Sequence, residues 1–274
     1  MKISWYPGHM NKARKELART LRKAHAVIEI LDARAPLASS NPLLAEMTAG
    51  LPVLKILNKS DLAETETTQS WLQYFTASAN SNAISSDNDK QNLSGRVKEA
   101  LKQFLDQDTV TTKHALVVGI PNVGKSTIIN ALAGRKAART GNEPAITKGQ
   151  QQIRLDGDWM LIDTPGMMWP NLEDQRAALR LALMGSIRQT ALDIEDVGWA
   201  AAELLYESHP QRLQERYALP DAPDSTETLM TGIARHIGAL GKSGKTDWHK
   251  TSEALLNDFR SGKLGPISLE TPTQ

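Results

Sequence analysis

The chain has 274 residues, long enough for one large domain or two, and its 40% hydrophobic and 23% charged residues are ordinary for a globular protein. It contains no cysteine, which excludes disulfides, cysteine-ligated zinc sites and thiol catalysis. No apolar run is long enough to cross a membrane and the first residues lack the apolar core of a signal peptide, so we expect a cytoplasmic protein without membrane contact.

The formal net charge of +1 hides an uneven distribution. Residues 1–25 carry seven Lys and Arg against Glu16 alone, a balance of +6. Residues 193–227 carry nine acidic residues against two arginines, a balance of −7, and residues 235–263 carry six basic against three acidic residues, a balance of +3. A basic end is equally consistent with a solvated helix face and with binding to a polyanion such as RNA.

The N-terminal region predicts alternating helices and strands. Apolar residues at helical spacing, from Ala13 to Ala24, predict an amphipathic helix over residues 11–24. The apolar run at 26–32 predicts a buried strand, and a loop follows to Pro36. A short helix is then expected at 42–48, before a second strand at 53–57.

The N-K-x-D pattern follows this second strand directly, as Asn58, Lys59, Ser60 and Asp61. An ionised Asp61 accepts hydrogen bonds from both the N1–H and the 2-amino group of guanine, which adenine does not supply. Asn58 would join neighbouring loops to the base, and Lys59 belongs to the same nucleotide-binding motif. Four such residues also occur in ordinary polar turns, so the pattern gains weight only beside a phosphate site.

Helices are expected at 64–76 and 93–105, with a polar loop over 77–92 around the short run 82–86. The apolar run 114–118 then leads into the pattern G-x-x-x-x-G-K-[ST], and a helical segment follows. In this context the pattern predicts a loop whose backbone N–H groups and helix N-terminus hold phosphate. We assign nucleotide contacts to Asn122, Val123, Gly124, Lys125, Ser126 and Thr127, with Lys125 at the β and γ phosphates and Ser126 also at Mg²⁺.

A β-hairpin is expected at 150–155 and 159–162, because two short strands flank a turn at 156–158. Asp163 ends the second strand and begins the sequence Asp-Thr-Pro-Gly. A carboxylate beside the phosphate loop supplies a second anchor for Mg²⁺, and the N–H of Gly166 is expected to meet the γ-phosphate. Taken alone, this sequence is also a common turn.

From residue 172 onward the pattern predicts only helices, at 172–184, 194–206, 210–217, 226–240 and 246–260. This change places a domain boundary near Pro170. We therefore expect an α/β P-loop GTPase domain at 1–170, with a mainly parallel sheet and helices on both faces. A smaller all-α C-terminal domain is expected at 171–274.

The three motifs stand in a circularly permuted order. In a typical GTPase the phosphate loop comes first and N-K-x-D last, whereas here N-K-x-D precedes the phosphate loop and Asp163 comes last. Either order can close one site, because the carboxyl ends of parallel strands share one edge of the sheet. The chain runs from Gly166 straight into the helical region, so a γ-phosphate that orders this loop would act on that region.

Together with these motifs, the sequences at 5–10, 30–36, 147–150 and 258–265 resemble the circularly permuted ribosome-assembly GTPases of the YlqF/RbgA type over nearly the whole chain. The resemblance implies a GTP-hydrolysing assembly factor for the large (50S) ribosomal subunit, which binds rRNA in the GTP state and is released on hydrolysis. It implies Mg²⁺ as cofactor and, besides GTP and GDP, the large subunit and its rRNA as partners. The C-terminal domain is expected to bind RNA, and the protein to be a monomer.

The resemblance also assigns single residues. Thr147 resembles the switch threonine that completes Mg²⁺ coordination with Ser126 and Asp163, and Asn122 resembles an asparagine that helps to hold an activating K⁺ in relatives. Ser85 and Ser86 occupy the place of the loop behind the guanine, although the residues after them depart from the usual Ser-Ala-Lys.

Catalysis is expected to be slow without a partner. Met167 stands where many small GTPases have the glutamine that orients the attacking water, and an apolar side chain cannot do so. Stimulation by the ribosomal subunit is therefore expected. His9 is a candidate catalytic residue beside Lys125 and Thr147, or else a loop histidine that packs against Trp5.

Two further functions stay open at this point. One alternative to the assembly factor is a nucleotide-gated RNA-binding module in which hydrolysis is incidental, and the other is a GTPase that acts on another RNA or protein. Cosedimentation with a GTP analogue and the effect of removing His9 separate these functions.

Overall fold

The computed structural model describes residues 10–90, 92–104, 112–134, 151–155, 158–164, 166, 174–187, 192–219, 223–241 and 245–272, with side chains from residue 14 onward. The chain forms two compact units. The first, which we call the α/β unit, lies within Tyr6–Asn171 and takes in the chain again at Glu270–Gln274. The second, the helical unit, lies within Leu172–Leu269.

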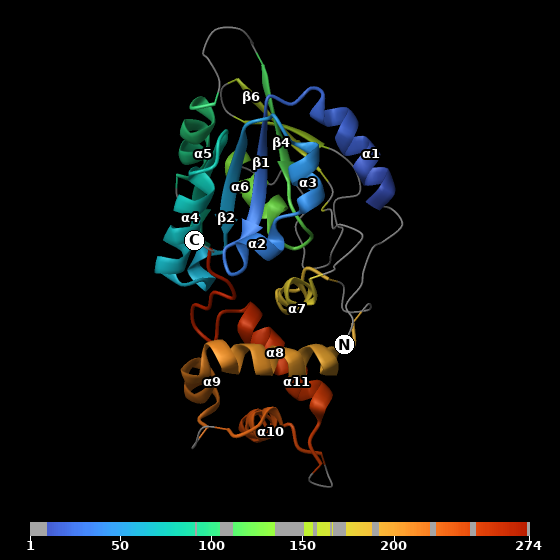
Figure 1. The fold of residues 1–274 in the computed structure, drawn as a ribbon, viewed down its shortest axis with the longest axis vertical. Coiled ribbons are helices and arrows are strands. Elements are labelled where there is room, and N and C mark those ends of the chain that lie inside the picture. The colour runs from blue at the N-terminus through green and yellow to red at the C-terminus, as the bar shows by residue number, and fades with distance from the viewer. Residues whose placement is uncertain are drawn as a thin grey trace. The chain divides into compact units, whose positions relative to one another are not determined.

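The α/β unit is built on a six-stranded sheet of order β3-β2-β1-β4-β6-β5 (Figure 1). Its strands are β1 (Ala26–Asp32), β2 (Val53–Asn58), β3 (Ser81–Ser86), β4 (Lys113–Val118), β5 (Gln151–Arg154) and β6 (Trp159–Asp163). Neighbouring strands pair in parallel except β5 and β6, which form the predicted hairpin. The apolar strand β1 is buried over its whole length, as expected for a central strand covered on both faces.

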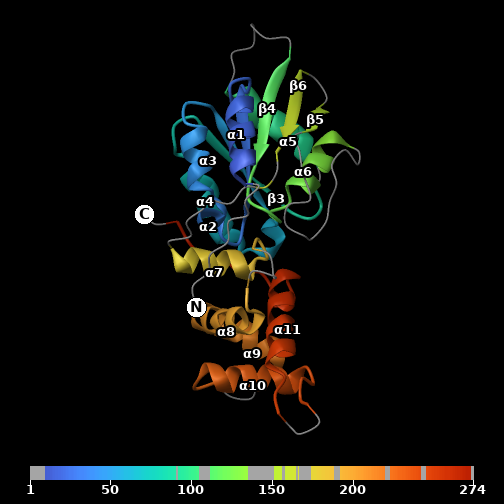
Figure 2. The same ribbon diagram turned by 90° about the vertical axis from the view of Figure 1, so that its right-hand side faces the viewer.

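Helices cover both faces of this sheet, as Figure 2 shows for α1, α3 and α4 on one side and α5 and α6 on the other. The chain steps from β1 to β2 to β3 in one direction and from β3 to β4 to β6 in the other. Right-handed crossovers therefore place the two sets of helices on opposite faces. The predicted fold class is confirmed. The helical elements are α1 (Met10–Leu21), α2 (Pro36–Ser39), α3 (Pro42–Met47), α4 (Thr65–Thr76), α5 (Leu93–Lys102), α6 (Lys125–Ala133) and the 3-10 helix η1 (Ser60–Leu62).

Two elements of this unit differ from the sequence prediction. The expected loop around 82–86 is the strand β3, which pairs in parallel with β2 over its whole length. The sequence pattern missed this strand because most of its side chains are polar. An edge strand depends on backbone pairing more than on burial of apolar side chains. The expected loop up to Pro36 continues into the short helix α2, which has this proline in its first turn, where a missing N–H costs nothing.

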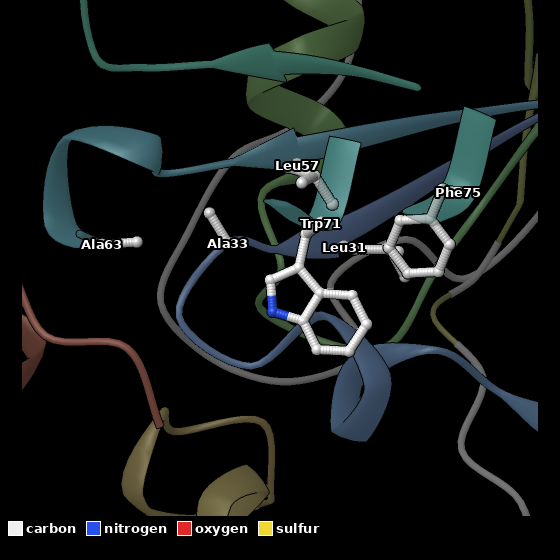
Figure 3. Close-up of a cluster of buried hydrophobic side chains, with 6 residues drawn as sticks. All are labelled: Leu31, Ala33, Leu57, Ala63, Trp71 and Phe75. Carbon is white, nitrogen blue, oxygen red and sulfur yellow. The ribbon is translucent and has the colours of Figure 1, made fainter. Parts of the chain in front are cut away.

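A hydrophobic cluster supports the carboxyl ends of β1 and β2 (Figure 3). Its members come from β1, β2, α4 and the loops between them: Leu31, Ala33, Leu57, Ala63, Trp71 and Phe75. The rings of Trp71 and Phe75 stack with centroids 5.4 Å apart. Both side chains are buried, so the strand ends that carry Asp32 and Asn58 rest on a rigid base.

The last part of the chain returns to this cluster. The indole Nε1 of Trp71 donates to the carbonyl oxygen of Glu270 at 3.1 Å, and the backbone N–H of Ala38 donates to Oε1 of Glu270 at 2.9 Å. Glu270 therefore belongs with the α/β unit by its contacts, while the helical domain at 171–274 stays a prediction.

The helical unit contains α7 (Gln175–Leu183), α8 (Ile194–Ser208), α9 (Pro210–Tyr217), α10 (Thr226–His236) and α11 (Trp248–Arg260). Side chains of Asp174, Asp193, Ser225 and Asp247 cap the N-termini of α7, α8, α10 and α11. Helices α8 and α11 cross closely, since a Cβ at Gly198 would lie 2.3 Å from the Ser252 side chain. No helix within the described ranges is both long enough and apolar enough to cross a membrane.

Candidate nucleotide-binding site

The loop between β4 and α6 depends on two glycines. Gly119 has φ +151°, and a Cβ there would lie 2.6 Å from the carbonyl oxygen of Ile30. Gly124 has φ +99°, and a Cβ there would lie 2.3 Å from Nδ2 of Asn58. Both positions favour glycine by backbone conformation and by close approach. The loop therefore lies tightly against β1 and against the N-K-x-D segment.

Lys125, the first residue of α6, turns back over this loop. Its ammonium donates to the carbonyl oxygen of Ile120 at 3.2 Å, and only 8% of the residue is exposed. Burial lowers the pKa of Lys125 to about 8, against an opposing effect of the Asp163 charge. A Cβ at Gly166 would lie 3.0 Å from Nζ of Lys125, so the Asp-Thr-Pro-Gly segment also reaches the phosphate loop.

Asp163 ends β6 beside the phosphate loop, where it stands in register with Val117 of β4. It is fully buried, and the next residue, Thr164, is held by a hydrogen bond from its hydroxyl to the carbonyl oxygen of Val117 at 2.7 Å. The carboxylate of Asp163 and the hydroxyl of Ser126 in the first turn of α6 are the oxygen donors that Mg²⁺ prefers. This donor set fits the ion.

The N-K-x-D segment is tied to the phosphate loop by two hydrogen bonds. Nδ2 of Asn58 donates to the carbonyl oxygen of Val123 at 2.8 Å, and Nζ of Lys59 donates to the carbonyl oxygen of Asn122 at 3.1 Å. Asn58 is buried, whereas Asp61 in η1 is exposed. The carboxylate of Asp61 is therefore accessible to a base.

An ionic cluster at the end of β1 was missed by the sequence analysis. Asp32 accepts from Nε and Nη2 of Arg34 at 2.9 and 2.8 Å and from Nζ of Lys59 at 2.9 Å. Burial alone would raise the pKa of Asp32, but the Arg34 and Lys59 cations hold it well below its usual range. The only sequence signal was an acid at a strand end with an arginine two residues later.

The end of β3 lies beside Asn58, since Ser86 stands in register with it. Ser86 is buried, and its hydroxyl has no hydrogen-bond partner in the part of the chain that the structure describes. The carbonyl oxygen of Ser85 accepts from Nη2 of Arg96 at 2.8 Å. Lys90, which the sequence analysis did not single out, donates from Nζ to Oδ1 of Asn58 at 2.9 Å.

The structure thus places thirteen of the predicted site residues at the carboxyl ends of β2, β3, β4 and β6, in the loops that follow them, in η1 or in the first turn of α6. They are Asn58, Lys59, Asp61, Ser85, Ser86, Asn122, Val123, Gly124, Lys125, Ser126, Thr127, Asp163 and Gly166. Their individual roles stay predictions. His9 and Thr147 lie outside the described residues. The arrangement offers backbone amides and a lysine for phosphates and an exposed carboxylate for a purine base.

Known proteins are similar to this chain in sequence and in fold. Residues 114–204 match the family model described as 50S ribosome-binding GTPase. "Ribosome biogenesis GTPase A" from Bacillus cereus is 39% identical, covering 100% of this chain and 95% of the relative. "Mitochondrial ribosome-associated GTPase 1" from Mus musculus is 32% identical over 97% of this chain and 89% of the relative.

Solved structures agree. GDP-bound YlqF superimposes with a TM-score of 0.70 at 26% identity, covering 94% of this chain and 99% of that one. GNP-bound YlqF from T. maritima gives a TM-score of 0.68, with 96% and 99% covered. On the full-length similarity and the permuted arrangement of its nucleotide site, this chain belongs to the ribosome biogenesis GTPase A (RbgA/YlqF) family and is a GTPase.

Proposed function

We propose that this GTPase is an assembly factor for the large (50S) ribosomal subunit, which contacts rRNA in its GTP state and leaves after hydrolysis. The observation that carries the proposal is the similarity over the full chain to proteins named for ribosome biogenesis, at up to 39% identity. The description of the matching family model, 50S ribosome-binding GTPase, supports the large subunit as the target.

The charge of α1 supports contact with RNA. On this helix the side chain of Leu17 is buried, with 2% of the residue exposed, while Arg14, Lys15 and Arg19 are exposed. The exposed Arg22 and Lys23 follow the helix. Several cations in one exposed row suit a phosphate backbone, whose counterions they displace. We assign a second, weaker RNA contact to the helical unit, through its basic stretch at 235–263, because the stretch at 193–227 carries the opposite charge.

For hydrolysis, we assign Mg²⁺ coordination to Ser126, Thr147 and Asp163. Held by these residues, Mg²⁺ would neutralise the negative charge that develops on the phosphates. Lys125 is assigned to the same phosphates and the N–H of Gly166 to the γ-phosphate. We assign Asn122 to an activating K⁺ and His9 to the γ-phosphate of the subunit-bound form, because Met167 cannot orient the attacking water.

The test is GTP turnover by the full chain with purified 50S subunits, with 30S subunits as the matched control, in K⁺ and in Na⁺. We expect slow turnover alone, a large increase with 50S only, and a further dependence on K⁺. Lys125→Ala should remove all turnover and so controls for contaminating GTPases. Equal rates with 50S, with 30S and without subunits would refute the coupling to the large subunit.

A second measurement separates this function from a nucleotide-gated RNA-binding module. His9→Ala should lose the stimulated turnover while its cosedimentation with 50S subunits in the presence of a non-hydrolysable GTP analogue is unchanged. An equal loss of both would assign His9 to docking.

A further inference from the structure

Lys90 occupies a defined place beside the N-K-x-D segment. It ends the turn after β3 with φ +54°, and its ammonium donates to Oδ1 of Asn58 at 2.9 Å and to the carbonyl oxygen of Asp87. The turn is held by its own bonds, because Oδ1 of Asp87 accepts from the backbone N–H of Asp89 at 3.1 Å and of Lys90 at 3.3 Å. The position of Lys90 is therefore set by the turn.

The chemistry of the two groups fixes the orientation of the Asn58 amide. An ammonium has only donors, so the amide atom that faces it must be the oxygen. The amide nitrogen must then face the other way, where it donates to the carbonyl oxygen of Val123 at 2.8 Å. Lys90, Asn58 and Val123 thus form one directed chain of hydrogen bonds from the turn after β3 to the phosphate loop. A flipped amide would place its nitrogen against the Lys90 ammonium and its oxygen against the carbonyl oxygen of Val123, so both partners favour the same orientation.

The charges around Lys90 belong to the same site. Burial lowers the pKa of Lys90, while the carboxylates of Asp61 and Asp87 raise it and the Lys59 cation lowers it. Asp61 carries the predicted guanine contact, and its carboxylate is near enough for its charge to act on Lys90. The buried Ser86 hydroxyl stands in register with Asn58 on the neighbouring strand.

We infer that Lys90 is a positioning residue for guanine-nucleotide binding, which orients the Asn58 amide so that N-K-x-D and the phosphate loop are held together before the nucleotide arrives. The inference concerns nucleotide binding by the GTPase and is independent of its ribosomal partner. The segment after Ser86, where the sequence departs from Ser-Ala-Lys, is the turn that carries Lys90 to Asn58.

The test measures the dissociation constant of GDP by competition with a fluorescent GDP analogue, in the full chain. Lys90→Met should weaken GDP binding about tenfold, the size expected for one hydrogen bond to a charged group. Lys90→Arg should restore most of the affinity, because a guanidinium also has only donors. Lys102→Met is the matched control, since its ammonium pairs with Glu99 at the surface of α5, and it should bind as the parent does.

A double-mutant cycle tests the route through Asn58. In an Asn58→Ala background, Lys90→Met should cause no further loss, because the group that it orients is gone. The inference is overturned if Lys90→Met binds GDP like Lys102→Met, if arginine fails to rescue, or if the loss is as large with Asn58→Ala as without it. Thermal unfolding without nucleotide shows that the variants are folded; should Lys90→Met unfold, Lys90→Gln takes its place in the same cycle.

Discussion

Lys59 donates to Oδ2 of Asp32 at 2.9 Å, and the same ammonium donates to the carbonyl oxygen of Asn122 at 3.1 Å. One side chain of the N-K-x-D motif therefore joins the end of β1 to the phosphate loop. Asp32 is also bound by Arg34 and is 1% exposed. A permuted GTPase domain thus connects three segments far apart in sequence through the Lys59 ammonium, which a buried carboxylate holds in place.

Asp32→Asn should destabilise the protein and weaken nucleotide binding together. Removing one partner from a buried ionic cluster costs about 3–5 kcal/mol, because the remaining charges lose their compensation. We expect that loss in the free energy of urea unfolding and a higher dissociation constant for GDP. Glu29→Gln is the matched control, because Glu29 is also a buried carboxylate. It pairs with Lys55 on the same two strands, three residues before the paired positions of Asp32 and Asn58. It should lower stability and leave GDP affinity nearly unchanged, and equal effects of both variants on affinity would contradict the proposed connection.

Gly124→Ala should abolish tight nucleotide binding while the fold survives. The added Cβ would meet Nδ2 of Asn58 at 2.3 Å and force φ +99° on an alanine. A lost buried hydrogen bond together with the backbone strain amounts to about 3 kcal/mol, or roughly 100-fold in affinity. Titration with a fluorescent GDP analogue measures this loss.

Gly134→Ala serves as its control, because Gly134 also has a positive φ, +63°, but a Cβ there would meet nothing within 4 Å. It should cost about 1–2 kcal/mol of stability at the C-terminus of α6 and leave GDP affinity as it was. A similar drop in affinity for both variants would mean that backbone strain, and not the contact with Asn58, decides binding.

GTP binding should take up a proton at alkaline pH. Burial lowers the pKa of Lys125 to about 8 in the nucleotide-free protein, and phosphates beside it would raise that pKa again. Above pH 8 the free lysine is mostly neutral and must be protonated on binding. Affinity should therefore be pH-independent well below pH 8 and fall by about tenfold per pH unit above it. Calorimetry in buffers of different ionisation enthalpy at about pH 9 should show uptake of nearly one proton, and no uptake would show that Lys125 is already charged or does not meet the phosphates.

Asp61→Asn should change the preferred base from guanine to xanthine. The side chain is exposed and available to a ligand, and an amide can donate to the 2-oxo group of xanthine where the carboxylate accepted from the 2-amino group of guanine. The ratio of the XDP to the GDP dissociation constant reports the change. If selectivity for GDP persists in this variant, Asp61 is not the group that reads the base.

Much of the site could be predicted because strand ends carry its motifs. The apolar runs before Asn58, Gly119 and Asp163 read as strands, and the carboxyl ends of β2, β4 and β6 do meet at one edge. The contacts between loops could not be predicted in the same way. Asp32, Arg34 and Lys90 belong to the site because the fold brings Asp32 to Lys59 and Lys90 to Asn58. The hydrophobic periodicity of a sequence carries no information on such contacts between side chains. The edge strand β3 was missed for a related reason, since its backbone pairing with β2 stabilises it despite its polar side chains.

The hydrogen bonds of Trp71 and Ala38 to Glu270 fasten the segment after the helical unit to the α/β unit. The chain thus rejoins the α/β unit beside Trp71, in the hydrophobic cluster at the ends of β1 and β2. Proteolytic scission between residues 166 and 174 would cut the covalent connection and leave Glu270 held to the α/β unit by non-covalent contacts, among them these two hydrogen bonds.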